Sequence, residues 1–283
     1  MPDVVLRGGE VDGLRLHYLV DGRGPSVILV HGLGGFAEYW RHNVGPLAAR
    51  ATVYALDLPG FGLSAKPRTE YPLSYLARAV GGFMDTLGLA QASVVGHSLG
   101  GAVATTYALM HPSRVERLAL LGALVPGFAY KLSWPARIAA LYGIGEALSR
   151  CGCAPLYKAA IARCFFNPNE TEIDFLVDTC YAERTGPEAR AAFLATLRHV
   201  KRDFVDHAAD YRRALATLEA PVLMIHGRQD GVVPWSHCAE VARGMPRAVV
   251  RSIERCGHFP HIEHAAAVNG WLADFLVGRP APR

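Results

Sequence analysis

The 283-residue chain lacks several features that mark particular classes of protein. No uninterrupted apolar run reaches the roughly 18 residues that suggest a membrane-spanning helix. The first residues, MPDVVLRGGEVDGLRLHYLVDG, carry neither the basic start nor the continuous apolar block of a signal peptide. Lysine and arginine are scattered and the formal net charge is +4, so no nucleic-acid-binding patch is indicated. We therefore expect a cytoplasmic monomer or homodimer with a small-molecule partner, no nucleic acid and no stable membrane association.

The six cysteines follow no zinc-binding spacing. With 51% hydrophobic and 19% charged residues, the chain can bury a sizeable core without a disulfide framework. His261 and His264 fit the start of a helix better than a metal site. We expect free thiols, no metal and no other cofactor.

The spacing of apolar residues predicts strands that alternate with helices over the first part of the chain. Alternating stretches at 4–10 and 14–20 predict a strand pair, and a third strand follows at 26–30. The next predicted helices are 37–50, 73–89 and 100–112, and the next predicted strands are 51–57, 92–96 and 115–122. Such alternation is typical of an α/β protein whose mostly parallel sheet carries helices on both faces.

The alternation breaks at about Ala123 and resumes after Leu218. Between them the sequence predicts several helices, one of them over 134–150, and no strand. Asn169 and Glu172 fit a capping box there, and Pro187 suits the first turn of another helix. We predict a core of residues 1–123 and 214–283, with a helical cap or lid inserted at 124–213. The predicted core resumes with strands at 220–227 and 247–254 and helices near 236–244 and within 263–277.

One serine stands between two glycines in GHSLG, residues 96–100, where a predicted strand meets a predicted helix. So sharp a turn strains its middle residue and brings two backbones together, where side chains at Gly96 and Gly100 would clash. The Ser98 hydroxyl is then held at the carboxyl edge of the sheet, beside the positive end of a helix. This pattern predicts that Ser98 is a nucleophile.

A serine hydroxyl at neutral pH needs a base within hydrogen-bond reach and a third group that orients the base. His258 is the best candidate base, because Gly257 lets the chain turn in a loop between the last predicted strand and the last helix. Asp230 follows the strand at 220–227 in a loop at the same sheet edge. The sequence therefore predicts the chain order Ser98, Asp230, His258 for the reacting groups.

Acyl transfer also needs N–H donors for the oxyanion of the tetrahedral intermediate. The Leu99 amide lies directly after the predicted nucleophile. Glycines in HGLGG, residues 31–35, allow a second backbone N–H to face the site, and we nominate Leu33.

Five segments together resemble the α/β-hydrolase fold family in its capped form. HGLGG, DLPGFGLS, GHSLGG, GRQDGVVP and GHFPHIEH occur in the family's order and span nearly the whole chain. The resemblance implies an eight-stranded, mostly parallel sheet, the triad Ser98, Asp230 and His258, and the oxyanion donors Leu33 and Leu99. It also implies structural support from His31, Gly32, Gly96 and Gly100, and framework hydrogen bonds from His97 and His226.

Serine at the nucleophile position restricts the reactions that the resemblance implies. Haloalkane dehalogenases and epoxide hydrolases of this fold carry aspartate there, whereas Ser98 forms an acyl ester that water later hydrolyses. We expect a carboxylesterase, a serine esterase that cleaves apolar, short- to medium-chain carboxylic esters.

The nearest alternative is the group of this family that cleaves carbon–carbon bonds in ring-fission products. Those enzymes commonly have asparagine before the serine, proline in the oxyanion loop and tryptophan after the histidine. This chain has His97, HGLGG and Phe259 at these places. Perhydrolase, lactonase and ligand-binding receptor of the same fold also stay open.

The substrate pocket is expected between the core and the lid. Phe36 and Trp40 follow the oxyanion loop and are expected to touch substrate, together with His97 and Phe259. Apolar lid residues such as Tyr130 and Phe165 offer surface for a pocket wall, and most residues of this set are expected to form the core of the lid instead.

Overall fold

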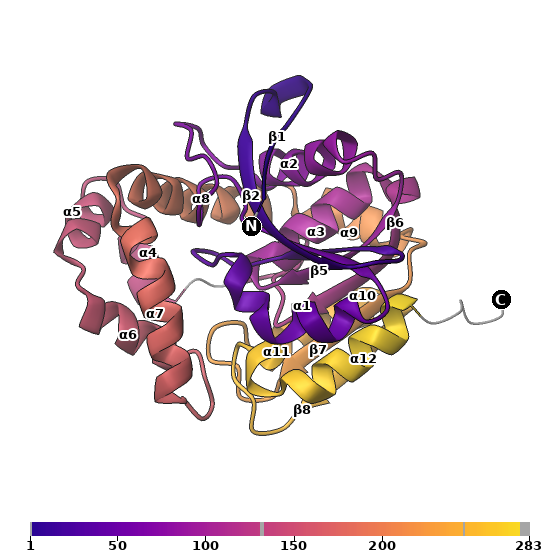
Figure 1. Ribbon diagram of the computed structural model, residues 1–283. Helices are drawn as coiled ribbons and strands as arrows, with labels where there is room; N and C mark the ends of the chain where they lie inside the picture. The colour runs from indigo at the N-terminus through magenta and orange to yellow at the C-terminus, as the bar shows by residue number, and fades with distance from the viewer. Residues whose placement is uncertain (1, 131–132, 246, 278–283) are drawn as a thin grey trace.

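Eight strands form one sheet in the computed structural model, which describes residues 2–130, 133–245 and 247–277 (Figure 1). In spatial order they are β1 (Asp3–Val5), β2 (Arg15–Gly22), β4 (Thr52–Leu56), β3 (Ser26–Val30), β5 (Ala92–His97), β6 (Val115–Leu121), β7 (Val222–Gly227) and β8 (Ala248–Ile253). The pairs β1–β2 and β2–β4 are antiparallel, and all the others are parallel. The predicted mostly parallel sheet is confirmed. The first strand is shorter than predicted, because a 3-10 turn, η1 (Gly9–Val11), follows it.

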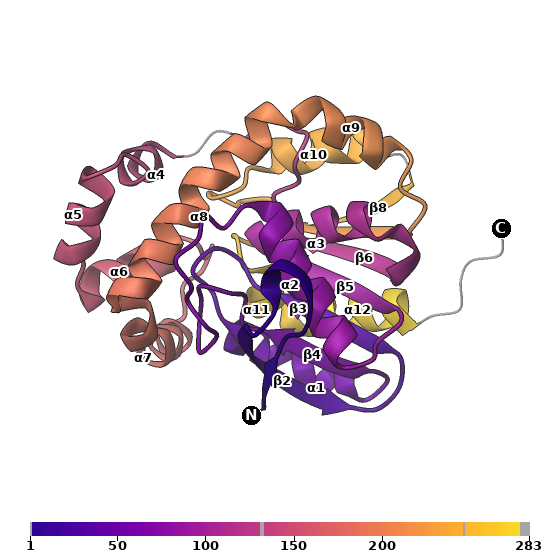
Figure 2. The same ribbon diagram turned by 90° about the horizontal axis from the view of Figure 1, so that it is seen from above.

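Helices cover both faces of the sheet (Figure 2). One face carries α2 (Leu73–Thr86), α3 (Leu99–Met110) and α10 (Trp235–Gly244), and the other carries α1 (Arg41–Ala48) and α12 (Ala265–Val277). Short helical turns η2 (Ala37–Trp40), η3 (Pro112–Arg114) and α11 (Pro260–Glu263) lie in the connections. Since every residue of β5 and of β7 is buried, these strands read as continuous apolar runs rather than as alternating ones.

Between β6 and β7 the described residues form helices and no strand. We call these helices the helical segment. They are α4 (Trp134–Ala139), α5 (Ile144–Cys151), α6 (Ala154–Ala162), α7 (Glu170–Thr185), α8 (Pro187–Asp206) and α9 (Ala208–Ala216). In Figure 2, α4 to α7 lie beside the sheet and the long α8 leads back to α9 above it. The helix predicted over 134–150 is divided before α5, because Gly143 adopts a φ of 78°. The expected boundary at 213 falls inside α9.

No helix within the described ranges is long and apolar enough to cross a bilayer.

The predicted capping box at α7 forms only in half. The Asn169 side chain accepts a hydrogen bond from the Glu172 amide at 3.3 Å, as an N-cap does. The Glu172 carboxylate does not return to Asn169. It pairs instead with Arg41 and, at 3.1 Å, with His42 Nε2. This carboxylate therefore ties the helical segment to α1 on the sheet.

Buried polar side chains hold the loops at the carboxyl edge of the sheet. His31 Nδ1 donates to the Gly32 carbonyl at 2.7 Å, and its Nε2 accepts from the Leu58 amide at 3.0 Å. The Asp57 carboxylate accepts from the Ala37 amide at 2.6 Å and from the Leu63 amide at 2.7 Å. Both side chains thus support the segments HGLGG and DLPGFGLS, where support was predicted.

Burial lowers the pKa values of five histidines and so favours their neutral form in the folded protein. It lowers the pKa of His31 to about 4, and it also lowers the pKa values of His97, His226, His237 and His261. A neutral imidazole can donate from one nitrogen and accept at the other, as His31 does. Protonation would therefore break the bonds that His31 Nε2 and His237 Nε2 accept.

We expect the free energy of unfolding to fall as the pH drops from about 6.5 to about 4. The unfolded chain takes up protons on histidine near pH 6.5, whereas the folded chain does not, so protons favour the unfolded state; His31 alone contributes about 3 kcal/mol. Burial raises the pKa of Asp57 to about 6 and also raises the pKa values of Asp203 and Glu263, so these carboxyls offset part of the loss. Urea unfolding at several pH values measures how the free energy of unfolding changes with pH. The variant His31→Gln should show a smaller change than the parent. An equal free energy of unfolding at pH 7 and at pH 4.5 would contradict the lowered pKa values of the buried histidines.

Candidate active site

The turn from β5 into α3 holds Ser98 in a strained conformation. Its φ of 53° and ψ of −121° lie outside the regions that L residues ordinarily adopt. A Cβ atom at Gly96 would lie 2.3 Å from the Gly100 carbonyl oxygen, and one at Gly100 would lie 2.2 Å from the Val30 carbonyl oxygen. Both glycines are therefore required by close backbone approach, and the second approach is to β3 rather than to β5.

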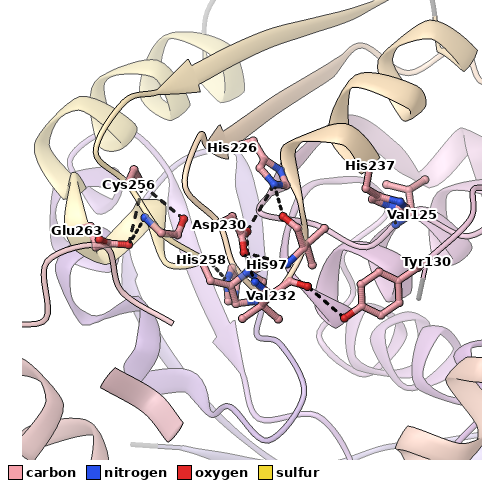
Figure 3. Close-up of polar contacts among 12 residues, drawn as sticks. His97, Val125, Tyr130, His226, Asp230, Val232, His237, Cys256, His258 and Glu263 are labelled. Carbon is pink, nitrogen blue, oxygen red and sulfur yellow. Dashed lines mark hydrogen bonds and ion pairs between the residues drawn. The ribbon is translucent and has the colours of Figure 1, made fainter. Parts of the chain in front are cut away.

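Asp230 and His258 lie side by side at the same edge (Figure 3). Asp230 follows β7 and His258 follows β8. The His258 Nδ1–H donates to Asp230 Oδ2 at 2.8 Å. The other carboxylate oxygen accepts from the Val232 and Val233 amides, each at 2.8 Å. This leaves His258 Nε2 as the nitrogen that is free to take a proton.

Several groups keep the Asp230 carboxylate charged. Burial alone would raise its pKa, but His258, His226 and the Val233 amide outweigh that effect and hold the pKa below its usual value. His226 Nε2–H donates to the Val233 carbonyl at 2.8 Å and lies 3.5 Å from Asp230 Oδ2. His226 thus supports the loop, as predicted.

Three contacts fix the loop that carries His258. Its amide donates to the Cys164 carbonyl at 2.7 Å, and its own carbonyl accepts from His97 Nε2–H at 2.8 Å. The Glu263 carboxylate accepts from the Gly257 amide at 2.8 Å. Because Cys164 follows α6, the helical segment takes part in placing the histidine.

The two amides nominated as oxyanion donors flank the same cavity. Leu99 begins α3 directly after Ser98, and Leu33 follows β3. Among the described hydrogen bonds of turns and loops, neither amide donates to a protein acceptor. Both N–H groups are therefore available to a ligand.

A cavity of about 240 Å³ brings these groups together. Gly32, Leu33, His97, Ser98, Leu99, His258 and Phe259 line it from the sheet side. Phe36 and Trp40 do not line it, which corrects the expectation that they touch substrate. Trp40 is 0% exposed because η2 turns its ring into the core against His261, and Phe36 packs on Tyr39, which lines the cavity instead.

The helical segment adds cavity residues that the sequence analysis missed or assigned elsewhere. Tyr157, Arg184 and Phe193 line the cavity, and so does Tyr130 from the loop before the segment, one of the apolar residues considered for the pocket wall. Arg184 Nη1 donates to the Gly34 carbonyl at 2.9 Å and to Tyr157 Oη at 3.0 Å. No local motif marks Arg184, so only the packing of α7 over the oxyanion loop shows its place.

Arg184 has no acidic partner among the described residues. Its guanidinium lies instead over the rings of Tyr157 and Phe193, at 4.6 and 4.9 Å from their centroids. A cation in such apolar surroundings is costly unless a negative charge pairs with it. The cavity therefore offers a positive charge to a ligand.

Comparison with known proteins gives a consistent result. The family model for the alpha/beta hydrolase fold matches residues 25–146 and 181–265. The chain is 32% identical to the 2-hydroxy-6-oxo-6-phenylhexa-2,4-dienoate hydrolase of Burkholderia cepacia, over 97% of this chain and 95% of that protein. It is also 32% identical to a 2-hydroxy-6-oxononadienedioate/2-hydroxy-6-oxononatrienedioate hydrolase of Dechloromonas aromatica, over 97% and 94%.

A solved structure agrees with these sequence relatives. The 2-hydroxy-6-oxo-6-phenylhexa-2,4-dienoate hydrolase of a Rhodococcus strain superposes with a TM-score of 0.79 at 28% identity, over 93% of this chain and 94% of that one. The eight-stranded sheet, the strained serine turn and the matched family model lead to one conclusion: the chain belongs to the α/β-hydrolase fold family.

Proposed function

We propose that this protein is a serine hydrolase that cleaves a carbon–carbon bond beside the carbonyl group of a small substrate bearing a carboxylate. The observation that carries the proposal is Arg184, a cation without an acidic partner among the described residues, in the same cavity as Ser98 and His258. The hydrolase class follows from the family, and the bond and the substrate are the proposed part.

In the proposed first step, Ser98 Oγ attacks the substrate carbonyl carbon while His258 Nε2 takes the hydroxyl proton. Asp230, bound to His258 Nδ1, stabilises the imidazolium that forms. The Leu33 and Leu99 amides donate to the oxyanion, and one such donor is typically worth about 3 to 4 kcal/mol of the barrier.

The second part of the reaction breaks the bond between the carbonyl carbon and its neighbour. The electron pair goes to the neighbouring carbon, which needs a conjugated second carbonyl to receive it and then takes the proton from His258. Water hydrolyses the remaining acyl ester and restores Ser98. In sum, one water is consumed, one fragment leaves as a carboxylic acid and the other gains a hydrogen.

Arg184 supports a substrate with a carboxylate group. A guanidinium has five N–H donors, and only Nη1 is used by protein acceptors among the described residues. A carboxylate could accept from the remaining donors in a charge-assisted pair. The relatives from Burkholderia cepacia and Dechloromonas aromatica are named as dienoate and dienedioate hydrolases, so the substrates in their names are carboxylates.

A second candidate is hydrolysis of an ester or lactone that bears a carboxylate. His97 and Phe259 favour it, because the carbon–carbon hydrolases commonly have asparagine and tryptophan at these places. In this protein the Phe259 ring stacks on the His97 ring, with the centroids 5.0 Å apart. The same triad and the same arginine would serve either substrate, so the scissile bond has to be tested directly.

We expect the purified protein to turn over 2-hydroxy-6-oxo-dienoate ring-fission products faster than p-nitrophenyl esters, as kcat/KM measured by absorbance. Ser98→Ala should lower either activity by at least 1000-fold while the protein stays folded, because the nucleophile is lost. Circular dichroism of this variant is the control. Faster cleavage of carboxylate-bearing esters or lactones than of the dienoates would favour the second candidate.

We expect Arg184→Met to raise KM for a carboxylate-bearing substrate by about 10- to 100-fold, because a hydrogen bond to a charged group is worth roughly 1.5 to 3 kcal/mol. Neutral p-nitrophenyl acetate should be affected far less. Arg163→Met, at an exposed position in the same helical segment, is the matched control and should leave KM unchanged. Equal losses on charged and neutral substrates would show that Arg184 only supports the fold.

A further inference from the structure

A second cavity of about 580 Å³ lies next to the catalytic one. The loop after β6 lines it with Phe128 and Tyr130, and the helical segment lines it with Val200, Phe204, Val205 and Arg212. Its lining is thus largely apolar and aromatic, and the charged residues Arg137, Arg212 and Glu240 complete it. None of the reaction steps above uses this space.

The two cavities share a wall. Tyr130 and Val200 line both of them, whereas Ser98 and His258 line only the catalytic one. The helix α8 runs along both, with Phe193 and Leu197 facing the first cavity and Phe204 and Val205 facing the second. The ring of Tyr130 stands near that of Phe204, with the centroids 6.3 Å apart.

The Tyr130 ring is held in place from two sides (Figure 3). Its hydroxyl donates to the Val232 carbonyl at 3.3 Å, in the loop that also carries Asp230. His237 holds the loop before it: Nδ1–H donates to the Ala129 carbonyl, and Nε2 accepts from the Val125 amide, both at 3.2 Å. The wall is therefore built into the structure rather than left to a freely rotating side chain.

The strand order places this wall opposite the arginine. Arg184 bonds to Gly34 after β3, Ser98 follows β5, and Tyr130 follows β6 and contacts the loop after β7. In the sheet, β5, which leads to Ser98, lies between β3, whose following loop contacts Arg184, and β6, whose following loop carries Tyr130. A substrate whose carboxylate binds Arg184 would point its other end at Tyr130.

We propose that Tyr130 is a specificity-determining residue whose ring ends the catalytic cavity and sets the longest substituent that fits beyond the scissile carbonyl. The cavity on its far side is the space that a longer apolar substituent would enter if the ring were absent. This inference rests on the proposed function, because it takes the substrate carboxylate to bind at Arg184.

Binding of straight-chain monocarboxylates from four to twelve carbons tests the proposal without catalysis. We would measure dissociation constants by titration calorimetry in a Ser98→Ala background. Each methylene that finds apolar space should tighten binding by about fourfold. With Tyr130 present, the gain should stop at a chain length that fills the first cavity. With Tyr130→Ala it should continue for several further carbons.

Two further variants make the result specific. Tyr130→Phe keeps the ring and loses only the bond to Val232, so its chain-length limit should match that of the parent. Val205 is 67% exposed and lines the second cavity, so Val205→Trp should fill that cavity without disturbing the core. In the double variant with Tyr130→Ala, the Val205→Trp change should remove the tighter binding of long-chain monocarboxylates.

The outcomes separate the two proposals. An unchanged limit in Tyr130→Ala, or a gain that persists after Val205→Trp is added, would overturn the role of Tyr130 and leave the proposed function standing. Monocarboxylates that bind equally well with and without Arg184→Met would instead overturn the carboxylate site and, with it, the substrate class. An extended limit in Tyr130→Ala that Val205→Trp reverses would establish the wall.

Discussion

Backbone crowding at the turn from β5 into α3 is the constraint on which the rest of the site depends. The backbone of Gly96 packs against the first turn of α3, and that of Gly100 packs against the end of β3. At both glycines a Cβ atom would clash with a backbone carbonyl oxygen. This contact holds Ser98 at a φ of 53° and fixes three backbones at one edge of the sheet. Because the parallel strands end at that edge, the loops after β7 and β8 reach the serine as well.

Neutral buried side chains then hold these loops without adding charge to the cavity. His31 joins two loops, because Nδ1–H donates to the Gly32 carbonyl and Nε2 accepts from the Leu58 amide, and His97 Nε2–H donates to the carbonyl of His258. A framework of this kind orients the hydrogen-bond donors before the substrate binds. Such preorganisation is the main source of electrostatic catalysis. Its cost is sensitivity to acid, since a protonated imidazole cannot accept a hydrogen bond.

The helical segment adds to the site contacts and lining residues that the sheet does not provide. The Cys164 carbonyl holds the His258 amide, so the segment takes part in placing the base. Arg184 brings a positive charge to the cavity, and Tyr130, from the loop that leads into the segment, lines it as well. Reaction and selectivity are thus divided between two parts of the chain. The loops at the edge of the sheet carry the proposed nucleophile, acid and base, and the segment between β6 and β7 forms much of the cavity wall around them.

The amino-acid sequence by itself determined the order of strands and helices, the turn at Ser98 and the grouping of Asp230 with His258 at one sheet edge. Those features depend on local patterns, namely apolar periodicity, glycine spacing and position after a strand. Only the tertiary structure decided which side chains face the cavity. Trp40 turned into the core and Arg184 turned into the cavity, because the packing of η2 and α7 against their neighbours orients each side chain. No periodicity within one element records that packing, since it depends on residues more than a hundred positions away.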